Sequence, residues 1–369
     1  MTIKAYEDSL MQYSDYIAHK QILLVVSPIL LVIGTLGNVF SFFILMNNAK
    51  KASTYSYLSV LALMDLIVLY IGLFRHWLGL FVLDIEDMNN VLCKIVKFLG
   101  YFSSDTSVWL IVAVTIERTI VVMVPLKAPR FCNARNARIT IATIITFFFL
   151  VNFHFLWSVK LQELSYNDTI ISKCQAKPQY SYLVENIWPW VDAGIYSFVP
   201  FSVIIILNGF IIQNVISAKK ARDILRQHSS FSSTGPKQRS QGEMNKKITF
   251  MLLAVSIAFL VTTLPMVIVL IYTSFAEDAG DDYSLTKRML IETIAEMLMY
   301  TNHSINFFLY CATGKKFRNQ FKSLICCCSK KNFQRQSTVN FTESYRLCKV
   351  NETDMNRIHV QKEDDGVQL

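Results

Sequence analysis

Charge is scarce in this chain: only 17% of its 369 residues are charged, whereas 53% are hydrophobic. A soluble globular protein rarely has this balance, which is typical of a protein with several membrane spans. The eight cysteines are also too few for a disulfide-rich scaffold. The net charge of +9 is spread over short connections instead of forming one block, so it indicates membrane topology and argues against a nucleic-acid partner.

We expect no cleavable signal peptide either, because the first twenty residues are mixed and polar. Residues 21–49 then contain no Lys, Arg, Asp or Glu, and this stretch is too long for a signal peptide, so we expect a retained span. Seven apolar runs are long enough to cross a bilayer, where backbone hydrogen bonding requires helices. They are residues 22–46, 55–82, 94–122, 138–158, 190–217, 246–274 and 289–311.

The connections between these runs predict the orientation. Basic residues follow the first, third, fifth and seventh runs, as at Lys50 and Lys51, whereas the alternate connections at 84–87 and 277–282 are acidic. Positive residues favour the cytosolic side, so the N-terminus should be extracellular and the C-terminus cytosolic. We expect an extracellular segment at 1–21, a helical domain at 22–325, and a mostly disordered tail at 326–369 that lacks apolar periodicity.

The third run connects the two membrane faces. It starts at Cys93 near one face and ends with Glu117-Arg118-Thr119 near the other. The stretch of helix from Cys93 to Arg118 is about 37 Å long, slightly more than the thickness of a bilayer core. One end can therefore form an extracellular disulfide while the other presents an ion pair to the cytosol.

Polar residues inside spans are costly, which makes them candidates for function. Here they and two prolines form motifs in a fixed order: Gly37-Asn38, Leu61-Ala62-Leu63-Met64-Asp65, Glu117-Arg118-Thr119, Pro200, Pro265 and Asn306-Phe307-Phe308-Leu309-Tyr310. With these motifs the chain resembles the rhodopsin-like (class A) G-protein-coupled receptors over residues 22–325. The runs 262–265 and 302–310 look like those of invertebrate neuropeptide receptors of the FMRFamide and myosuppressin type.

Several positions depart from the family pattern. The fourth run has no Trp in its middle, and Thr262-Thr263-Leu264-Pro265 replaces the motif Cys-Trp-x-Pro. Asn208 stands where many members have Tyr, and Phe307 replaces the proline of the seventh run. The indole and the tyrosine of the family's usual switch are therefore absent.

The residues narrow the ligand class that the resemblance implies. Retinal would need a lysine in the seventh run for its Schiff base, and residues 289–313 contain none. A monoamine would need an acid in the third run where Gly100 stands. A short, amidated peptide remains the expected ligand.

The resemblance implies a disulfide between Cys93 and Cys174, which lie on the oxidising side. It also implies a cytosolic switch for a heterotrimeric G protein. The residues of this switch are Glu117, Arg118, Thr119, Asn208, Phe259, Pro265, Asn306 and Tyr310. Glu117 would lock Arg118 until helix six swings outward at Pro265, although Arg118 could instead snorkel to the inner interface.

Asp65, Ser107, Asn302 and Asn306 match the family's sodium site. A carboxylate with neutral oxygens suits a hard cation. The alternative is a hydrogen-bond network that only holds the helices together. Apart from this sodium ion, we expect no cofactor.

The expected ligand contacts are Arg75, Lys97, Tyr101, Trp190, Tyr196, Tyr272, Glu292 and Glu296. Glu292 and Glu296, one turn apart, would receive a cationic group of the ligand. Alternatively, these acids pair within the protein with Arg75, His76, Lys94 or Lys97. The aromatic members are also typical of the interfacial belt of a membrane protein.

Modification sites are expected outside the spans. Asn167 lies in an outer-loop glycosylation sequon. Residues 315–325 predict a short amphipathic eighth helix at the membrane lipid surface, followed by Cys326, Cys327 and Cys328 as palmitoylation candidates. Hydroxyl residues of the tail are candidate sites for a receptor kinase and arrestin.

The sequence thus predicts an all-α membrane protein of the plasma membrane, a seven-transmembrane-helix bundle that acts as a neuropeptide receptor. We expect no enzyme activity, because no catalytic constellation is evident. A constitutively active receptor, or one with a non-peptide ligand, is the nearer alternative. A transporter or channel is the more distant one, since internal repeats and a file of buried charges are missing.

Overall fold

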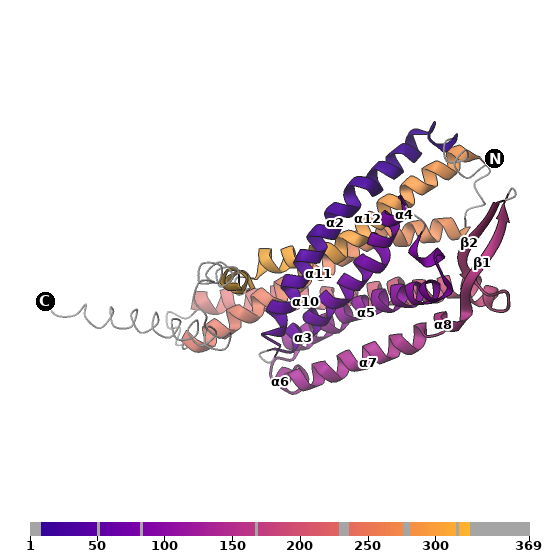
Figure 1. The fold of residues 1–369 in the computed structure, drawn as a ribbon. Coiled ribbons are helices and arrows are strands. Elements are labelled where there is room, and N and C mark those ends of the chain that lie inside the picture. Colours follow the sequence, from indigo (N-terminus) through magenta and orange to yellow (C-terminus); the bar gives the residue numbers. More distant parts are fainter. Residues whose placement is uncertain are drawn as a thin grey trace, which may run out of the picture. The chain divides into compact units, whose positions relative to one another are not determined.

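The computed structural model describes residues 9–49, 52–81, 84–166, 169–228, 236–275, 281–314 and 317–324. The chain divides into two compact units, Met1–Arg318 and Asn319–Leu369. The first unit contains the long helices and one small sheet (Figure 1). All sites discussed below belong to this unit.

The helical segments follow one another along the chain as the apolar runs predict. Their bounds are α2 Ser14–Met46; α3 Ser53–Val68, η1 Leu69–Phe74 and α4 Arg75–Gly79; η2 Ile85–Asp87; α5 Asn90–Met123; α6 Ala128–Phe131; α7 Ala134–Asn152 and α8 Phe155–Ser158; η3 Pro178–Tyr180; η4 Tyr182–Ile187, α9 Trp188–Asp192, η5 Ala193–Phe198 and α10 Val199–His228; α11 Pro236–Phe275; and α12 Asp282–Thr313.

Six segments of the described residues are long and apolar enough to cross a membrane: Ser14–Met46, Ser53–Gly79, Asn90–Met123, Ala134–Ser158, Tyr182–Ala218 and Thr249–Thr273. The seventh predicted span corresponds to α12, which is 32 residues long but has charged residues in its first half, at Lys287, Arg288, Glu292 and Glu296. The prediction of a helical membrane bundle is confirmed.

The helix bounds correct the predicted ones at several places. α2 begins at Ser14, so the predicted extracellular segment 1–21 contains the first two turns of this helix. α11 begins at Pro236, ten residues before the predicted start at 246. Hydropathy marks only the apolar part of a helix, whereas hydrogen bonding continues beyond it. Of the predicted eighth helix, residues 317–324 are helical and 315, 316 and 325 lie outside the described residues.

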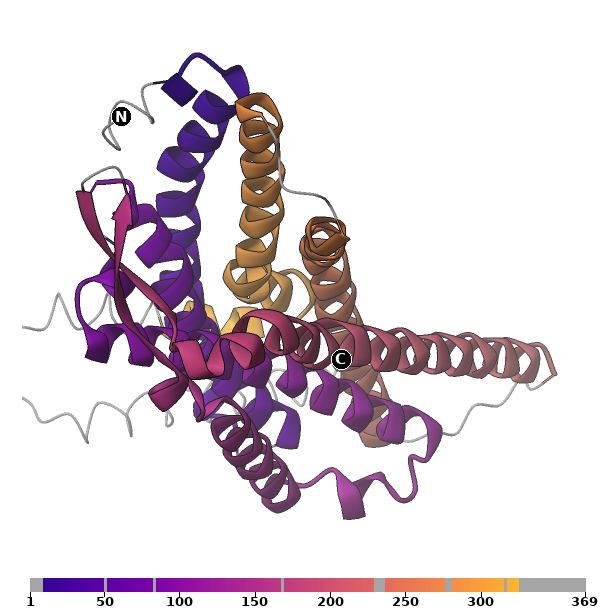
Figure 2. The same cartoon turned by 90° about the vertical axis from the view of Figure 1, so that its right-hand side faces the viewer.

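A two-stranded sheet interrupts the helical pattern and was not predicted. Strands β1 (Val159–Tyr166) and β2 (Thr169–Ala176) are antiparallel, with Val159 opposite Ala176 and Tyr166 opposite Thr169 (Figure 2). The sheet lies between two spans, where hydropathy gives no signal. We call the end of the unit that carries this hairpin the hairpin end, and the opposite end of α5 the Arg118 end.

Three segments have π-helical hydrogen bonding: η1, η4 and η5, each six residues long. Each is continuous with α-helical turns, so these are wide turns inside spans and not separate elements. All three lie in the parts of their spans that lead to or from the hairpin end.

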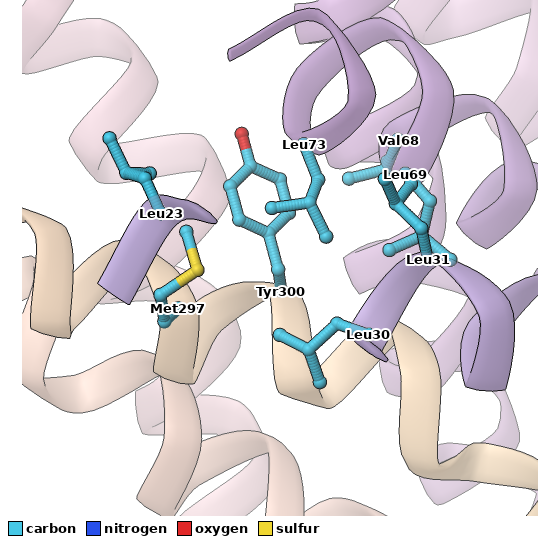
Figure 3. Packing of buried hydrophobic residues seen from close by; sticks show 8 residues of the cluster. All are labelled: Leu23, Leu30, Leu31, Val68, Leu69, Leu73, Met297 and Tyr300. Carbon is cyan, nitrogen blue, oxygen red and sulfur yellow. The ribbon is translucent and has the colours of Figure 1, made fainter. Parts of the chain in front are cut away.

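Helices α2 and α12 lie side by side, although they come from opposite ends of the described chain (Figures 1 and 2). A cluster of buried apolar side chains joins them to α3 and η1: Leu23, Leu30, Leu31, Val68, Leu69, Leu73, Met297 and Tyr300 (Figure 3). A Cβ on Gly34 would lie 2.5 Å from Leu69 Cδ1 and 2.8 Å from Ser304 Oγ. A small residue is therefore required where the helices approach.

Candidate functional site

A disulfide fixes the hairpin to the start of α5. The sulfur atoms of Cys93 and Cys174 are 2.04 Å apart and their Cα atoms 5.4 Å apart, which confirms the predicted pairing. The bond closes a sequence separation of 81 residues. It therefore ties strand β2 to the third span.

The loop before α5 forms a second attachment of the hairpin. Asp87 is 3% exposed and accepts a hydrogen bond from the backbone N–H of Cys174, with Oδ1 2.7 Å from the nitrogen. Its Oδ2 lies 3.3 Å from Lys173 Nζ. Asn90 Oδ1 accepts from the N–H of Leu161 at 2.8 Å. Asp87, one of the acids at 84–87 that the sequence analysis used only for orientation, thus helps to hold the hairpin in place.

Arg75 and Lys97, two of the expected ligand contacts, are paired within the protein. Arg75 Nη1 lies 2.7 Å from Asp84 Oδ2 and 3.0 Å from Glu86 Oε1. Lys97 Nζ lies 3.2 Å from Glu86 Oε2. The alternative of internal pairing holds for both cations, but their partners are acids of the loop and not Glu292 or Glu296.

The two acids of α12 differ in their partners. Glu292 Oε1 lies 2.9 Å from Arg288 Nε, one turn earlier. Glu296 Oε2 lies 3.5 Å from His76 Nδ1. His76 Nε2 lies 2.8 Å from Arg75 Nη2, and because arginine only donates, Nε2 accepts and the imidazole proton is on Nδ1. Glu296 therefore faces a neutral imidazole, whereas Glu292 faces a cation.

The expected aromatic contacts separate into two groups. The ring of Tyr101 stacks on Phe155 with centroids 4.7 Å apart and meets the edge of Trp188 at 6.0 Å. Tyr196 is half-buried in η5. Trp190 and Tyr272 instead leave 47% and 67% of their surface exposed. Trp188, whose ring contacts that of Tyr101, is buried.

An acid in the middle of α5 was not assigned a role from the sequence. Asp105 is 1% exposed, and its Oδ2 accepts from Asn152 Nδ2 at 2.9 Å. Asp105 Oδ1 has no hydrogen-bond partner among the described residues. The only signal in the sequence was the presence of this acid inside a span.

Asp65 is the centre of a polar cluster that joins three helices. Ser107 Oγ and His303 Nδ1 each lie 2.8 Å from Asp65 Oδ1, and Asn306 Nδ2 lies 2.7 Å from Oδ2. Asn302, which was expected here, is buried, but its Nδ2 has no partner among the described residues. His303, which was not expected, takes that place. Nitrogen donors around the carboxylate do not fit a hard cation, which needs oxygen ligands.

The Arg118 end has a different arrangement from the one predicted. Glu117 Oε1 accepts a hydrogen bond from Ser53 Oγ of α3, and no ion pair between Glu117 and Arg118 is found in the described part of the chain. Arg118 is 5% exposed. Neither Arg118 Nε nor Glu117 Oε2 has a hydrogen-bond partner there. The predicted lock is therefore not formed directly: the hydrogen bond of the Glu117 carboxylate is to Ser53 of α3 and not to Arg118. Thr119 Oγ1 donates a hydrogen bond to Thr115 O at 2.9 Å.

A thiol lies beside this pair in the connection between α6 and α7. Cys132 Sγ is 3.7 Å from the carbonyl oxygen of Glu117. Burial raises the pKa of the Cys132 thiol to about 11. The thiol is therefore protonated at neutral pH and can act as a weak donor to the end of α5.

The remaining switch residues lie on α10, α11 and α12. Phe259 is fully buried and its ring meets that of Phe201 with centroids 5.3 Å apart. Pro265 lies within α11, six residues after Phe259. Asn208 is buried, and neither polar atom of its side chain has a partner among the described residues. Tyr310 is 1% exposed and packs against Phe317.

Four predicted modification sites lie outside the described residues: Asn167, Cys326, Cys327 and Cys328.

The family model for the rhodopsin family of seven-transmembrane receptors matches residues 37–310. The chain belongs to this family. The match covers the interval from Gly37 in α2 to Tyr310 in α12, and so includes Asp65, Arg118 and the disulfide. The prediction of a rhodopsin-like G-protein-coupled receptor is confirmed, and the chain is a signalling receptor with several membrane spans.

Curated relatives agree with this assignment. The receptor is 24% identical over 318 residues to a probable G-protein-coupled receptor of Caenorhabditis elegans, covering 82% of this chain and 69% of the relative. It is 24% identical over 341 residues to the human thyrotropin-releasing hormone receptor, covering 86% and 81%. It is 26% identical over 307 residues to the FMRFamide receptor of Drosophila melanogaster, covering 79% of this chain and 51% of that protein.

Proposed function

We propose that this receptor binds a short, amidated peptide at the hairpin end and activates a heterotrimeric G protein at the Arg118 end. Two relatives support the ligand class, because their names specify thyrotropin-releasing hormone and FMRFamide. In this proposal the hairpin end faces the outside of the plasma membrane and the Arg118 end the cytosol, as the basic connections favour. Arrestin and a receptor kinase would act on the tail.

The observation that carries the proposal is that Glu296 has no cationic partner among the described residues. The other acids considered at this end have cationic partners: Glu86 and Asp84 meet Arg75, and Glu292 meets Arg288. Glu296 is 26% exposed, and the only side chain paired with it in the described part of the chain is the neutral imidazole of His76, at 3.5 Å. A cationic group of the peptide would gain a charge-assisted hydrogen bond there without displacing a salt bridge.

The signal would reach the G protein through α11. Thr115 Oγ1 of α5 lies 3.2 Å from Ser256 Oγ of α11, and Phe259 packs on Phe201 of α10 one turn further along. Peptide binding would favour a state in which the part of α11 before Pro265 moves outward and breaks these contacts. Arg118 and Asn208, whose side chains have polar atoms without a partner within the described ranges, would then meet the G protein. By linkage, the G protein and the peptide strengthen each other's binding by the same factor.

A screen of amidated neuropeptides tests the proposal. Cells expressing the receptor would be read out for G-protein dissociation, with Arg118→Ala in parallel. We expect a saturable response that the variant loses. A high basal signal without any peptide response would instead indicate a constitutively active receptor, and ion flux that persists in Arg118→Ala would indicate a transporter.

Two variants then test the ligand cation. Glu296→Gln removes the charge without changing shape and should raise the peptide EC50 about tenfold, the loss of one charge-assisted contact. Glu292→Gln is the matched control, because this acid lies one turn away and is already paired with Arg288. An unchanged EC50 in Glu296→Gln, or equal effects of the two variants, would refute the role of Glu296.

A further inference from the structure

The Asp65 carboxylate is already satisfied by protein donors. Its Oδ1 accepts from Ser107 Oγ and His303 Nδ1, each at 2.8 Å, and its Oδ2 accepts from Asn306 Nδ2 at 2.7 Å. The side chains of Asp65 and His303 are 0% and 1% exposed. With the carboxylate oxygen as acceptor, the donor in this contact is His303 Nδ1.

A sodium ion would compete with these donors for the same lone pairs. A hard cation is held by several oxygen atoms that turn lone pairs towards it. The imidazole of His303 and the amide of Asn306 turn N–H groups to the carboxylate instead, and their protons repel a cation on that side. Two of the three groups around Asp65 therefore turn nitrogen donors towards it, and only the hydroxyl of Ser107 also has lone pairs that a sodium ion could use.

The position of His303 is fixed by contacts between α2 and α12. Its carbonyl oxygen accepts from Asn38 Nδ2 at 2.8 Å, and the hydroxyl of Ser304 lies 3.2 Å from the carbonyl oxygen of Leu30. The close approach at Gly34 lies at the same level of the two helices. The imidazole therefore cannot leave Asp65 without a shift of the whole helix or a change of rotamer inside a packed interior.

We propose that the imidazole of His303 takes the place of a sodium ion at Asp65, so that the conformational equilibrium of this receptor does not depend on sodium. The imidazole connects α3 to α12 by one direct hydrogen bond. A bound cation would make the same connection through its ligands. This inference concerns the Asp65 cluster alone and does not depend on the ligand or on the G protein.

Thermal unfolding of the purified full-length chain tests the proposal without any ligand. Tm would be measured at increasing NaCl, with choline chloride holding the ionic strength constant. We expect the parent chain to give the same Tm in both salts. His303→Ser removes the imidazole and offers a neutral oxygen, so this variant should gain a sodium-specific rise in Tm of about 2 °C or more, since a ligand that binds only the folded state stabilises it. Adding Asp65→Asn should abolish the gain.

Two results would overturn the proposal. One is a saturable, sodium-specific rise in the Tm of the parent chain that Asp65→Asn removes. The other is a folded His303→Ser variant that is as indifferent to sodium as the parent, because the imidazole would then not be what excludes the ion. If the serine variant does not fold, His303→Asn, which retains a carbonyl oxygen and more of the volume, is judged by the same criteria.

Discussion

The charged side chains of the hairpin end and of the Arg118 end differ in whether they have partners. At the hairpin end, the acids of the loop at 84–87 meet cations: Asp84 and Glu86 pair with Arg75, and Asp87 lies 3.3 Å from Lys173 Nζ. At the Arg118 end, Arg118, Glu117 and Asn208 are all buried, and each has a polar side-chain atom without a partner among the described residues.

This difference suggests that the hairpin end contributes to the stability of the receptor and the Arg118 end to its coupling. A buried polar atom without a partner costs about 1–3 kcal/mol, so the Arg118 end contains groups that a new partner can satisfy. At the hairpin end the acids of the loop at 84–87 already have cationic partners, and a disulfide ties the hairpin to α5. We therefore expect changes at the hairpin end to affect folding and ligand affinity, and changes at the Arg118 end to affect coupling.

The largest effect is expected from the disulfide. Cys93→Ser opens a loop of 81 residues and should lower the free energy of unfolding by about 4 kcal/mol, since closure of a long loop restricts the unfolded chain. The Tm of the purified receptor measures the loss. Cys132→Ser is the control, because Cys132 is a free thiol, and equal Tm losses in both variants would show that the disulfide has no special role.

At the other end, Arg118→Ala should abolish G-protein activation and leave peptide affinity within about threefold in the absence of G protein, a change below 1 kcal/mol. The reason is that Arg118 lies far along α5 from Cys93, at the opposite end of a 34-residue helix. Radioligand binding and nucleotide exchange measure the two properties separately. Arg130→Ala, in the exposed connection after α5, should preserve both, and a comparable loss of coupling there would indicate a general charge effect.

A change between the two ends should lower stability only. Gly34→Ala places a Cβ 2.5 Å from Leu69 Cδ1 and 2.8 Å from Ser304 Oγ, and such overpacking costs about 1–3 kcal/mol. Gly79→Ala is the matched control, because no atom lies within 4 Å of its added Cβ. Differential scanning fluorimetry compares the two variants. If Gly34→Ala were as stable as Gly79→Ala, the close approach of α2 and α12 would not hold.

The smallest effect is expected at the second attachment of the hairpin. Asp87→Asn keeps one acceptor for the N–H of Cys174 but removes the charge that faces Lys173. The loss should be about 1 kcal/mol, since a largely exposed lysine contributes little to an ion pair. Faster amide exchange in the hairpin reports it. Glu163→Gln, an exposed residue of β1, should leave the exchange rates unchanged.

Much of the fold could be predicted because membrane spans depend on local composition. Apolar runs predicted the helices, and the family motifs predicted the Cys93–Cys174 bond. Contacts between distant segments carried no local signal. Nothing in the sequence showed that Arg75 would form an ion pair with Asp84 and not with Glu296. The hydrogen bond from Ser53 to Glu117 had no signal in the sequence either.

At the Asp65 cluster, too, the sequence did not predict which side chain makes the contact. The motif pointed to Asn302, but its neighbour His303 makes the contact. Adjacent residues on a helix point about 100° apart, so a motif identifies a helix turn more reliably than a side chain. The hairpin was not predicted for another reason. Its two strands pair with each other, and they lie in a connection between spans, where the hydropathy pattern only separates spans from connections.

The wide turn at η1 has a consequence for insertions and deletions. A π-helical turn holds one residue more than an α-helical turn, so deleting a single residue within Leu69–Phe74 could restore a regular helix instead of breaking it. Everything beyond the deletion would then rotate by about 100° around the helix axis. Arg75 and His76 would turn away from Asp84 and Glu296 together, while Asp65, on the other side of η1, would stay in place. A change of one residue in length would thus remove the ion pair of Arg75 and the contact of His76 with Glu296 at the hairpin end without disturbing the centre of the bundle.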